Sequence, residues 1–284
     1  MIRAQGTPAG GRWRLGAIVG RVLGLALLVG VAGHFAPAWA QDELFVTNQD
    51  SNSVTVYFRT ADGDVTPVRT LSEGLTGLSD PSGLFLDTVN NELFVANAGN
   101  DTVTVYPLNW TDPNTPPIRK LDGLLTGLKT PTGVFVDTVH GELFVANFIA
   151  GSVTVYSRTA SGDTGPTRTL IGGSTGLAGP FGLAVDTVHN ELFVANFSTP
   201  SVTVYSRTAS GDTGSTRTIS GGDTGLGSPQ FVAVTVSAPI PTLSEWAQIG
   251  MAALLVLGGR LALRSFGKPQ DRLRSGLGKC LHTS

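Results

Sequence analysis

Three aspartates recur where short apolar segments end, and carboxylates in such a pattern can do chemistry. Asp87, Asp137 and Asp186 are 50 and 49 residues apart, and Thr235 takes the fourth place. A ring of carboxylates could bind a cation, since calcium takes about six to eight oxygen ligands. Each Asp also precedes Thr-Val and a tight turn, where a carboxylate caps backbone N–H groups. We expect this structural role, and the aspartates remain weak candidates for a metal site.

Other polar residues also recur at turns and strand ends. The repeated acids of the predicted hairpin tips are Asp62, Asp64, Asp163 and Asp212. The repeated arginines of the predicted outer strand are Arg69, Arg119, Arg168 and Arg217. We expect the acids to form turns rather than to bind calcium, and the arginines to be solvated or paired with repeated acids.

The classical catalytic residue types are few. His140 and His189 occupy equivalent turns where another repeat has Asn90, so a turn-forming role is favoured over catalysis or metal binding. Cys280 is the single cysteine and lies near the end of the chain, so no intramolecular disulfide is expected. We assign no catalytic residue and no cofactor, and we predict that the chain is not an enzyme.

These residues sit on a repeat that predicts the architecture. A segment reading ELFV(A/T)N, followed by (S/T)VTVY, begins at Glu43, Glu92, Glu142 and Glu191, with spacings of 49, 50 and 49 residues. A period of about 40–50 residues built from short β segments is typical of propeller blades. Val, Phe, Thr and Tyr favour strands, and the intervening Asn-Asn, His-Gly and His-Asn pairs favour tight hairpins. The fold class is therefore all-β, a propeller of four blades with about four antiparallel strands each.

The order of strands suggests how such a ring closes. The first copy begins at its second strand, and the last copy ends with a first strand at 231–236. If that strand pairs with residues 43–48, both chain ends complete one blade and two sheet edges are hidden. We expect a closed four-bladed ring, with an open array or a two-chain ring as alternatives.

The repeat carries a family resemblance over residues 41–236. LFVAN followed by VTVY, and preceded by PxGxxVD, resembles the NHL and YVTN repeats of bacterial propellers. Such families include binding modules, structural surface proteins and some enzymes, so the resemblance implies a fold rather than an activity.

The N-terminal segment is predicted to direct export. Residues 1–40 hold four arginines, an apolar run at 22–31, and Ala38-Trp39-Ala40, which fits cleavage before Gln41. An uncleaved N-terminal anchor is the alternative. Residues 41–238 follow as the propeller domain, with nine Lys and Arg against nineteen Asp and Glu. Because nucleic-acid affinity comes largely from basic residues, this acidic domain is not expected to bind nucleic acid.

The C-terminal segment, residues 239–284, changes composition. An apolar stretch at 246–263 would give about 27 Å of helix, close to a bilayer span, with Thr242 and Glu245 at capping-box spacing before it. The basic tail at 264–284 would lie in the cytoplasm by the positive-inside rule, so the propeller would face outward. An amphipathic surface helix is the alternative.

This segment closely resembles the IPTL-CTERM sorting signal. The residues that match its motif, within 240–246, are Ile240, Pro241, Thr242, Leu243 and Trp246. The resemblance implies an exosortase-type sorting enzyme as partner in a Gram-negative envelope. The protein would then be anchored in the inner membrane during sorting and afterwards lie at the surface or outside the cell.

Two functions are consistent with these features. The first is an exported binding or structural protein of the envelope or matrix, whose partner is an extracellular protein or glycan. The second is an enzyme similar to the propeller lactonases and lyases, but near-identical blades do not favour an active site. The strongest departure from the repeat is the loop 108–117, where Trp110 is our candidate for partner contact or, alternatively, a ring that covers a blade edge.

Overall fold

The computed structural model describes residues 42–72 and 74–235. These residues form fifteen short strands. The strands are β1 (Glu43–Asn48), β2 (Ser53–Phe58), β3 (Arg69–Leu71), β4 (Pro81–Asp87), β5 (Glu92–Asn97), β6 (Thr102–Pro107), β7 (Arg119–Leu121), β8 (Pro131–Asp137), β9 (Glu142–Asn147), β10 (Ser152–Ser157), β11 (Arg168–Leu170), β12 (Pro180–Asp186), β13 (Glu191–Asn196), β14 (Ser201–Ser206) and β15 (Arg217–Ser220). Short 3-10 helices at Leu124–Thr126 and Gly222–Thr224 follow β7 and β15.

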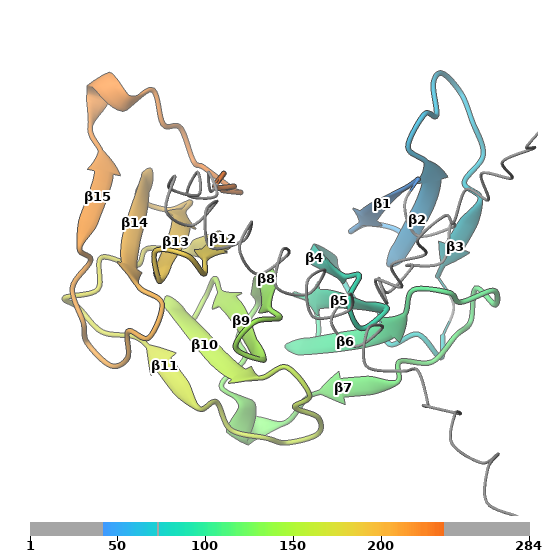
Figure 1. Ribbon diagram of the computed structural model, residues 1–284, viewed down its shortest axis with the longest axis horizontal. Coiled ribbons are helices and arrows are strands. Elements are labelled where there is room, and N and C mark those ends of the chain that lie inside the picture. Colours follow the sequence, from blue (N-terminus) through green and yellow to red (C-terminus); the bar gives the residue numbers. More distant parts are fainter. Residues whose placement is uncertain (1–41, 73, 236–284) are drawn as a thin grey trace, which may run out of the picture.

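The strands form four antiparallel sheets, which we call blades 1 to 4. Blade 1 contains β1 to β3, and blades 2, 3 and 4 contain β4 to β7, β8 to β11 and β12 to β15, each strand paired with its neighbours in sequence. The blades follow one another around an arc, with β4, β8 and β12 toward its centre and the short outer strands at its periphery (Figure 1). The predicted propeller-type arrangement of blades is confirmed.

The apolar second strands of the two inner blades, β5 and β9, are covered on both faces. In β5, Leu93, Phe94, Val95 and Ala96 are all fully buried. Alternation sends Phe94 and Ala96 toward blade 3, and Leu93 and Val95 toward blade 1. The near-continuous apolar run therefore reflects two neighbouring blades, as the sequence predicted.

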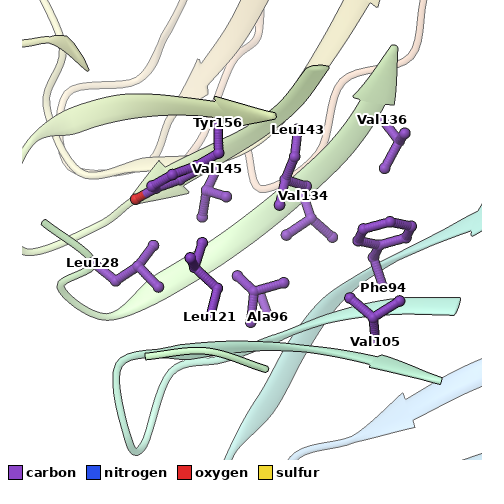
Figure 2. Packing of buried hydrophobic residues seen from close by; sticks show 11 residues of the cluster. Phe94, Ala96, Val105, Leu121, Leu128, Val134, Val136, Leu143, Val145 and Tyr156 are labelled. Atoms are coloured by element: carbon purple, nitrogen blue, oxygen red, sulfur yellow. The ribbon is translucent and has the colours of Figure 1, made fainter. Parts of the chain in front are cut away.

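The core lies between the blades. Figure 2 shows one such layer, in which Phe94, Val105 and Leu121 of blade 2 pack against Val145 and Tyr156 of blade 3. The Tyr156 hydroxyl donates a 2.5 Å hydrogen bond to the carbonyl of Thr126, and burial raises the pKa of this phenol to about 12. Tyr106 and Tyr205 make the same bond to Thr76 and Thr175. Each tyrosine thus fills the layer while its one polar atom stays satisfied.

Turn residues behave as their types predict. Asn91 and Asn190 adopt positive φ angles of 57° and 56°, and Gly141 takes the same place at 68°. Asn97 at the end of β5 is fully buried, donates to Thr104 Oγ1 at 2.9 Å and accepts the N–H of Ser79. The repeated Asn therefore ties the strand end to the connection that precedes the blade.

Neighbouring blades approach most closely along their first strands. A Cβ added to Gly83 would lie 2.5 Å from the carbonyl oxygen of Thr132 and 3.0 Å from the Cα of Gly133. Gly182 stands in the same relation to the carbonyl of Gln230. Only glycine permits this contact between backbones, which explains the Gly of the PxGxxVD pattern.

The predicted closure of the ring within one chain is wrong for the described residues. β1 pairs only with β2, and residues 231–235 are not part of a sheet. They lie instead beside β12, where the ring of Phe231 packs against Phe181 at 5.5 Å. Blade 1 and blade 4 stand at opposite ends of an open arc (Figure 1), which agrees with both alternatives, the open array and the two-chain ring. Strand pattern alone carries no information on the angle between blades, and that angle keeps the two ends apart.

The predicted leader, sorting motif, membrane helix and basic tail lie outside the described residues. In the part that is described, no helix is long and apolar enough to cross a membrane.

Replacing Gly83 with alanine tests the close approach of the first strands. We expect Gly83→Ala to lower the free energy of unfolding by about 1–3 kcal/mol, because the new Cβ meets backbone atoms that have no easy way to move. Urea unfolding followed by circular dichroism measures the change. The matched control is Gly173→Ala, since Gly173 has no atom within 4 Å of its added Cβ. Equal stability of the two variants would contradict the packing described here.

Candidate functional site

The three repeated aspartates are turn caps. Asp137 Oδ1 accepts the N–H groups of Val139 and His140 at 2.9 and 3.0 Å, and its Oδ2 contacts His140 Nδ1 at 2.7 Å. Asp87 and Asp186 do the same in their own turns. Burial raises the pKa of Asp186, but hydrogen bonds from His189 and Val188 outweigh it and leave the pKa below its usual value. The structural interpretation of these aspartates is confirmed.

The turn histidines belong to the same caps. His140 and His189 each bond their own aspartate through Nδ1. Among residues 42–72 and 74–235, no three His, Cys, Asp or Glu side chains gather closely enough to hold a metal ion.

The repeated arginines pair with the glutamates that open the second strands. Arg119 forms two bonds to Glu92, of 2.7 and 2.8 Å, and Arg168 forms two to Glu142, of 2.6 and 3.1 Å. Arg69 and Arg217 pair likewise with Glu43 and Glu191. The predicted pairing with repeated acids is therefore confirmed within every blade.

A second set of arginines joins one blade to the next, a role that the sequence pattern did not predict. Arg158 of blade 3 contacts Glu92 at 2.5 Å and Asp87 at 3.4 Å, both in blade 2. Arg207 of blade 4 contacts Glu142 and Asp137 of blade 3 in the same way. The sequence SRTASGDTG, shared by the hairpins after β10 and β14, could have indicated these contacts. It repeats an arginine at a position where hairpin formation does not require one.

These contacts hold the glutamates in the charged form. Burial raises the pKa of Glu92, but the hydrogen bonds and charges of Arg119 and Arg158 outweigh it, so the pKa of this carboxyl lies below its usual value. The pKa of Glu142 is lowered by Arg168 and Arg207 against the same opposing effect of burial. A carboxylate held charged between two guanidinium groups is poorly suited to general acid or base catalysis.

The hairpin-tip acids also act between blades. Asp163 Oδ1 accepts the N–H of Leu125 at 2.6 Å, and Asp212 Oδ1 accepts that of Ser174 at 2.6 Å. Both bonds reach back to the loop that follows the preceding blade. The turn interpretation placed these residues correctly in hairpin tips but missed the partner, which lies 38 residues earlier in the chain.

Trp110, our candidate for partner contact, is buried. Its side chain is 3% exposed and packs edge-on against Phe45 at 5.8 Å, while the guanidinium of Arg69 lies 4.6 Å from the ring. The alternative, a ring that covers a blade edge, is what the structure shows. Among the described residues Trp110 Nε1 has no hydrogen-bond partner. The ring also forms one wall of a hollow of about 380 Å³, together with Phe58 and Val68.

Two further hollows lie on the concave side of the arc. One, of about 360 Å³, is lined by the first strands of blades 2, 3 and 4 and by residues 231–234. A second, of about 280 Å³, lies where the same strands end, near Thr88, Thr138 and Thr187. The rings of Phe85 and Phe135 lie 4.9 Å apart and line both hollows. This face is suited to burying apolar surface of a partner and carries few groups for chemistry.

The comparisons with known proteins point to the same fold. Residues 58–178 match the family model described as "Lactonase, 7-bladed beta-propeller", which is less than half of the chain. A comparison with curated protein sequences gives no match.

Among solved structures, a chain of the nidogen/laminin complex aligns with a TM-score of 0.50 and 18% identity, over 68% of this chain and 65% of that one. Hydrazine synthase of Kuenenia stuttgartiensis aligns with a TM-score of 0.46 and 16% identity, over 62% of this chain and 45% of that one. A functionally unknown protein from Desulfotomaculum acetoxidans DSM 771 aligns with a TM-score of 0.47 and 14% identity, over 66% of this chain and 56% of that one. The chain thus spans less than two thirds of each of these neighbours. The family model and the alignment with the nidogen/laminin chain support a β-propeller type of fold.

Removing the charge of Glu92 tests the arginine bridge between blades. We expect Glu92→Gln to cost roughly 3 kcal/mol of the free energy of unfolding, because two partly buried guanidinium groups lose their common partner. The control is Asp122→Asn, since Asp122 pairs with Lys120 and both side chains are about 40% exposed; its cost should stay below about 1 kcal/mol. Urea titration at neutral pH measures both. A Glu92→Gln variant no less stable than the control would contradict the bridging role.

Proposed function

We propose that this chain is an exported β-propeller-type protein that serves as a binding or structural component of the cell envelope or its matrix. The observation that carries the proposal is the use of the repeated charged residues: the aspartates cap turns, and the glutamates and arginines bind blade to blade. What the concave face then offers is apolar surface around Phe85 and Phe135. Exposed apolar surface of this kind often marks an interaction site, so the face supports contact with an extracellular protein or glycan.

Export and display rest on the two terminal segments. The leader at 1–40 supports passage across the inner membrane, and the motif at 240–246 supports sorting by an exosortase-type enzyme. The apolar stretch at 246–263 would hold the protein in the inner membrane until the motif is processed. The acidic propeller, with ten more acids than basic residues, disfavours nucleic acid as a partner.

The two mature termini test this proposal. We expect the full chain, expressed in a Gram-negative host that carries an exosortase-type enzyme, to begin at Gln41, to end near the 240–246 motif and to fractionate with the cell surface or medium. Intact-mass spectrometry of the fractions gives both ends. Trp246→Ala should block the C-terminal cut, whereas Gln248→Ala, just outside the motif, should not. A product that keeps Ser284 in the inner membrane would sink the sorting proposal.

A lactonase-like enzyme is the second candidate, favoured by the family-model match over residues 58–178. The purified protein can be titrated in a pH-stat with a panel of sugar and acyl lactones, with heat-denatured protein as control. The binding or structural proposal predicts hydrolysis at the rate of the control. Saturable hydrolysis above that rate would replace it with the enzymatic function.

A further inference from the structure

The three blade junctions of this chain repeat one set of contacts. At each junction, an oxygen in the hairpin tip of one blade accepts an N–H from the loop after the preceding blade. The pairs are Asn114 Oδ1 with Leu75 at 2.8 Å, Asp163 Oδ1 with Leu125 at 2.6 Å, and Asp212 Oδ1 with Ser174 at 2.6 Å. Beside the last two pairs, Gly162 and Gly211 exchange backbone hydrogen bonds with the outer strand of the preceding blade. A junction therefore has a hairpin half and a loop half.

Blade 1 carries a hairpin half that faces no preceding blade. Arg59 matches Arg158 and Arg207 in position, since all three donate their backbone N–H to the carbonyl that precedes the second strand. Whereas Arg158 and Arg207 bind two carboxylates of the preceding blade, Arg59 is 66% exposed and lies 3.5 Å from Asp42. Asp64 occupies the same place in its hairpin as Asp163 and Asp212, and it is exposed.

Blade 4 carries the complementary loop half. Glu191 and Asp186 match the pairs that receive Arg158 and Arg207, and the N–H of Asp223 matches those of Leu125 and Ser174. The apolar contact is also incomplete. Ile219 is 53% exposed, whereas its equivalents Leu71, Leu121 and Leu170 are at most 2% exposed.

The first strands are also incomplete at both ends of the arc. Residues 230 and 231 lie against Gly182 as Thr132 and Gly133 lie against Gly83, so they occupy the first-strand position of a further blade. Blade 1 is the blade that lacks a first strand among the described residues. Its Leu44 is 52% exposed, whereas the equivalent Leu93 and Leu143 are at most 1% exposed. In the register of the other blades, Val232 would face Val46 as Leu183 faces Val194.

We propose that two copies of this chain close head to tail into one ring, in which blade 1 of each copy docks on blade 4 of the other. Arg59 then binds Glu191 and Asp186 of the second copy, Asp64 accepts the N–H of Asp223, and residues 231–235 supply the missing first strand to β1. The Arg59 guanidinium thus meets two carboxylates of the second copy, and Leu44 and Ile219 become buried. The two halves stand at opposite ends of the arc (Figure 1), which suits a second copy rather than the same one.

Disulfide trapping tests the docking. The exported protein is prepared from the full chain as Asp64→Cys/Asp223→Cys, with Cys280→Ser to remove the native thiol, and is oxidised. Non-reducing gel electrophoresis should show a species of two chains that reverts to one chain on reduction. The matched control is Leu75→Cys/Asn114→Cys, the same junction positions between blades 1 and 2, which should form its disulfide within one chain.

Each other outcome overturns the proposal. An intrachain disulfide at positions 64 and 223 would mean that the ring closes within one chain. A ladder of larger species would mean an open polymer. Sedimentation equilibrium of the unmodified protein gives an independent measure, and a mass of one chain at all concentrations would also overturn the proposal, whatever the disulfides do.

A charge variant tests the contact that sets the direction of docking. Arg59→Gln should weaken the two-chain species at least about tenfold in dissociation constant, since two carboxylates across the interface lose their charged partner. Lys129→Gln is the matched control, because Lys129 is 63% exposed and pairs with Asp101 at 3.0 Å on another blade. Equal dissociation constants for the two variants would contradict the role of Arg59.

Discussion

Each blade of this chain has two apolar faces, and each face is buried from solvent only by packing against a neighbouring blade. The second strand is the clearest case, since Leu93 and Val95 face one adjoining blade while Phe94 and Ala96 face the other. Three kinds of repeated residue support the packing between blades. Glycines let the first strands approach, tyrosines fill the layer and bond a carbonyl beyond it, and arginines bridge to carboxylates of the preceding blade. Stability thus comes from repeated interfaces, as in other arrays of similar units.

That constraint also explains what local sequence pattern could and could not predict. The period, the strands, the positive-φ turns at Asn91 and Gly141, and the turn-capping role of Asp137 all follow from residues close together in the chain. Contacts that span 38 to 66 residues did not follow, because they depend on the angle between blades. The bond from Asp163 to Leu125, the bridge from Arg158 to Glu92 and the burial of Trp110 are all of this kind. The prediction that the ring closes within one chain was wrong for the same reason, because closure also depends on the angle between blades.

The site residues illustrate how repetition bears on function. An aspartate that caps a turn, or a glutamate held charged between two arginines, performs the same structural task in successive blades. The blade that departs from its siblings uses its extra aromatic residue to fill the edge next to Phe45, where an arginine bridge is missing. The surface left for a partner is the apolar concave face and the two ends of the arc. This distribution favours the proposed role in binding or assembly.

Electron microscopy of the purified protein tests most directly the claim that the blade junction is the unit of assembly. Two-dimensional class averages of particles seen down the ring axis distinguish closed rings from open arcs. The unmodified sequence is used, so no amino-acid substitution is needed. The account predicts closed rings with two equivalent halves, each the length of one arc. Single C-shaped arcs with both ends bare at every protein concentration used would contradict it.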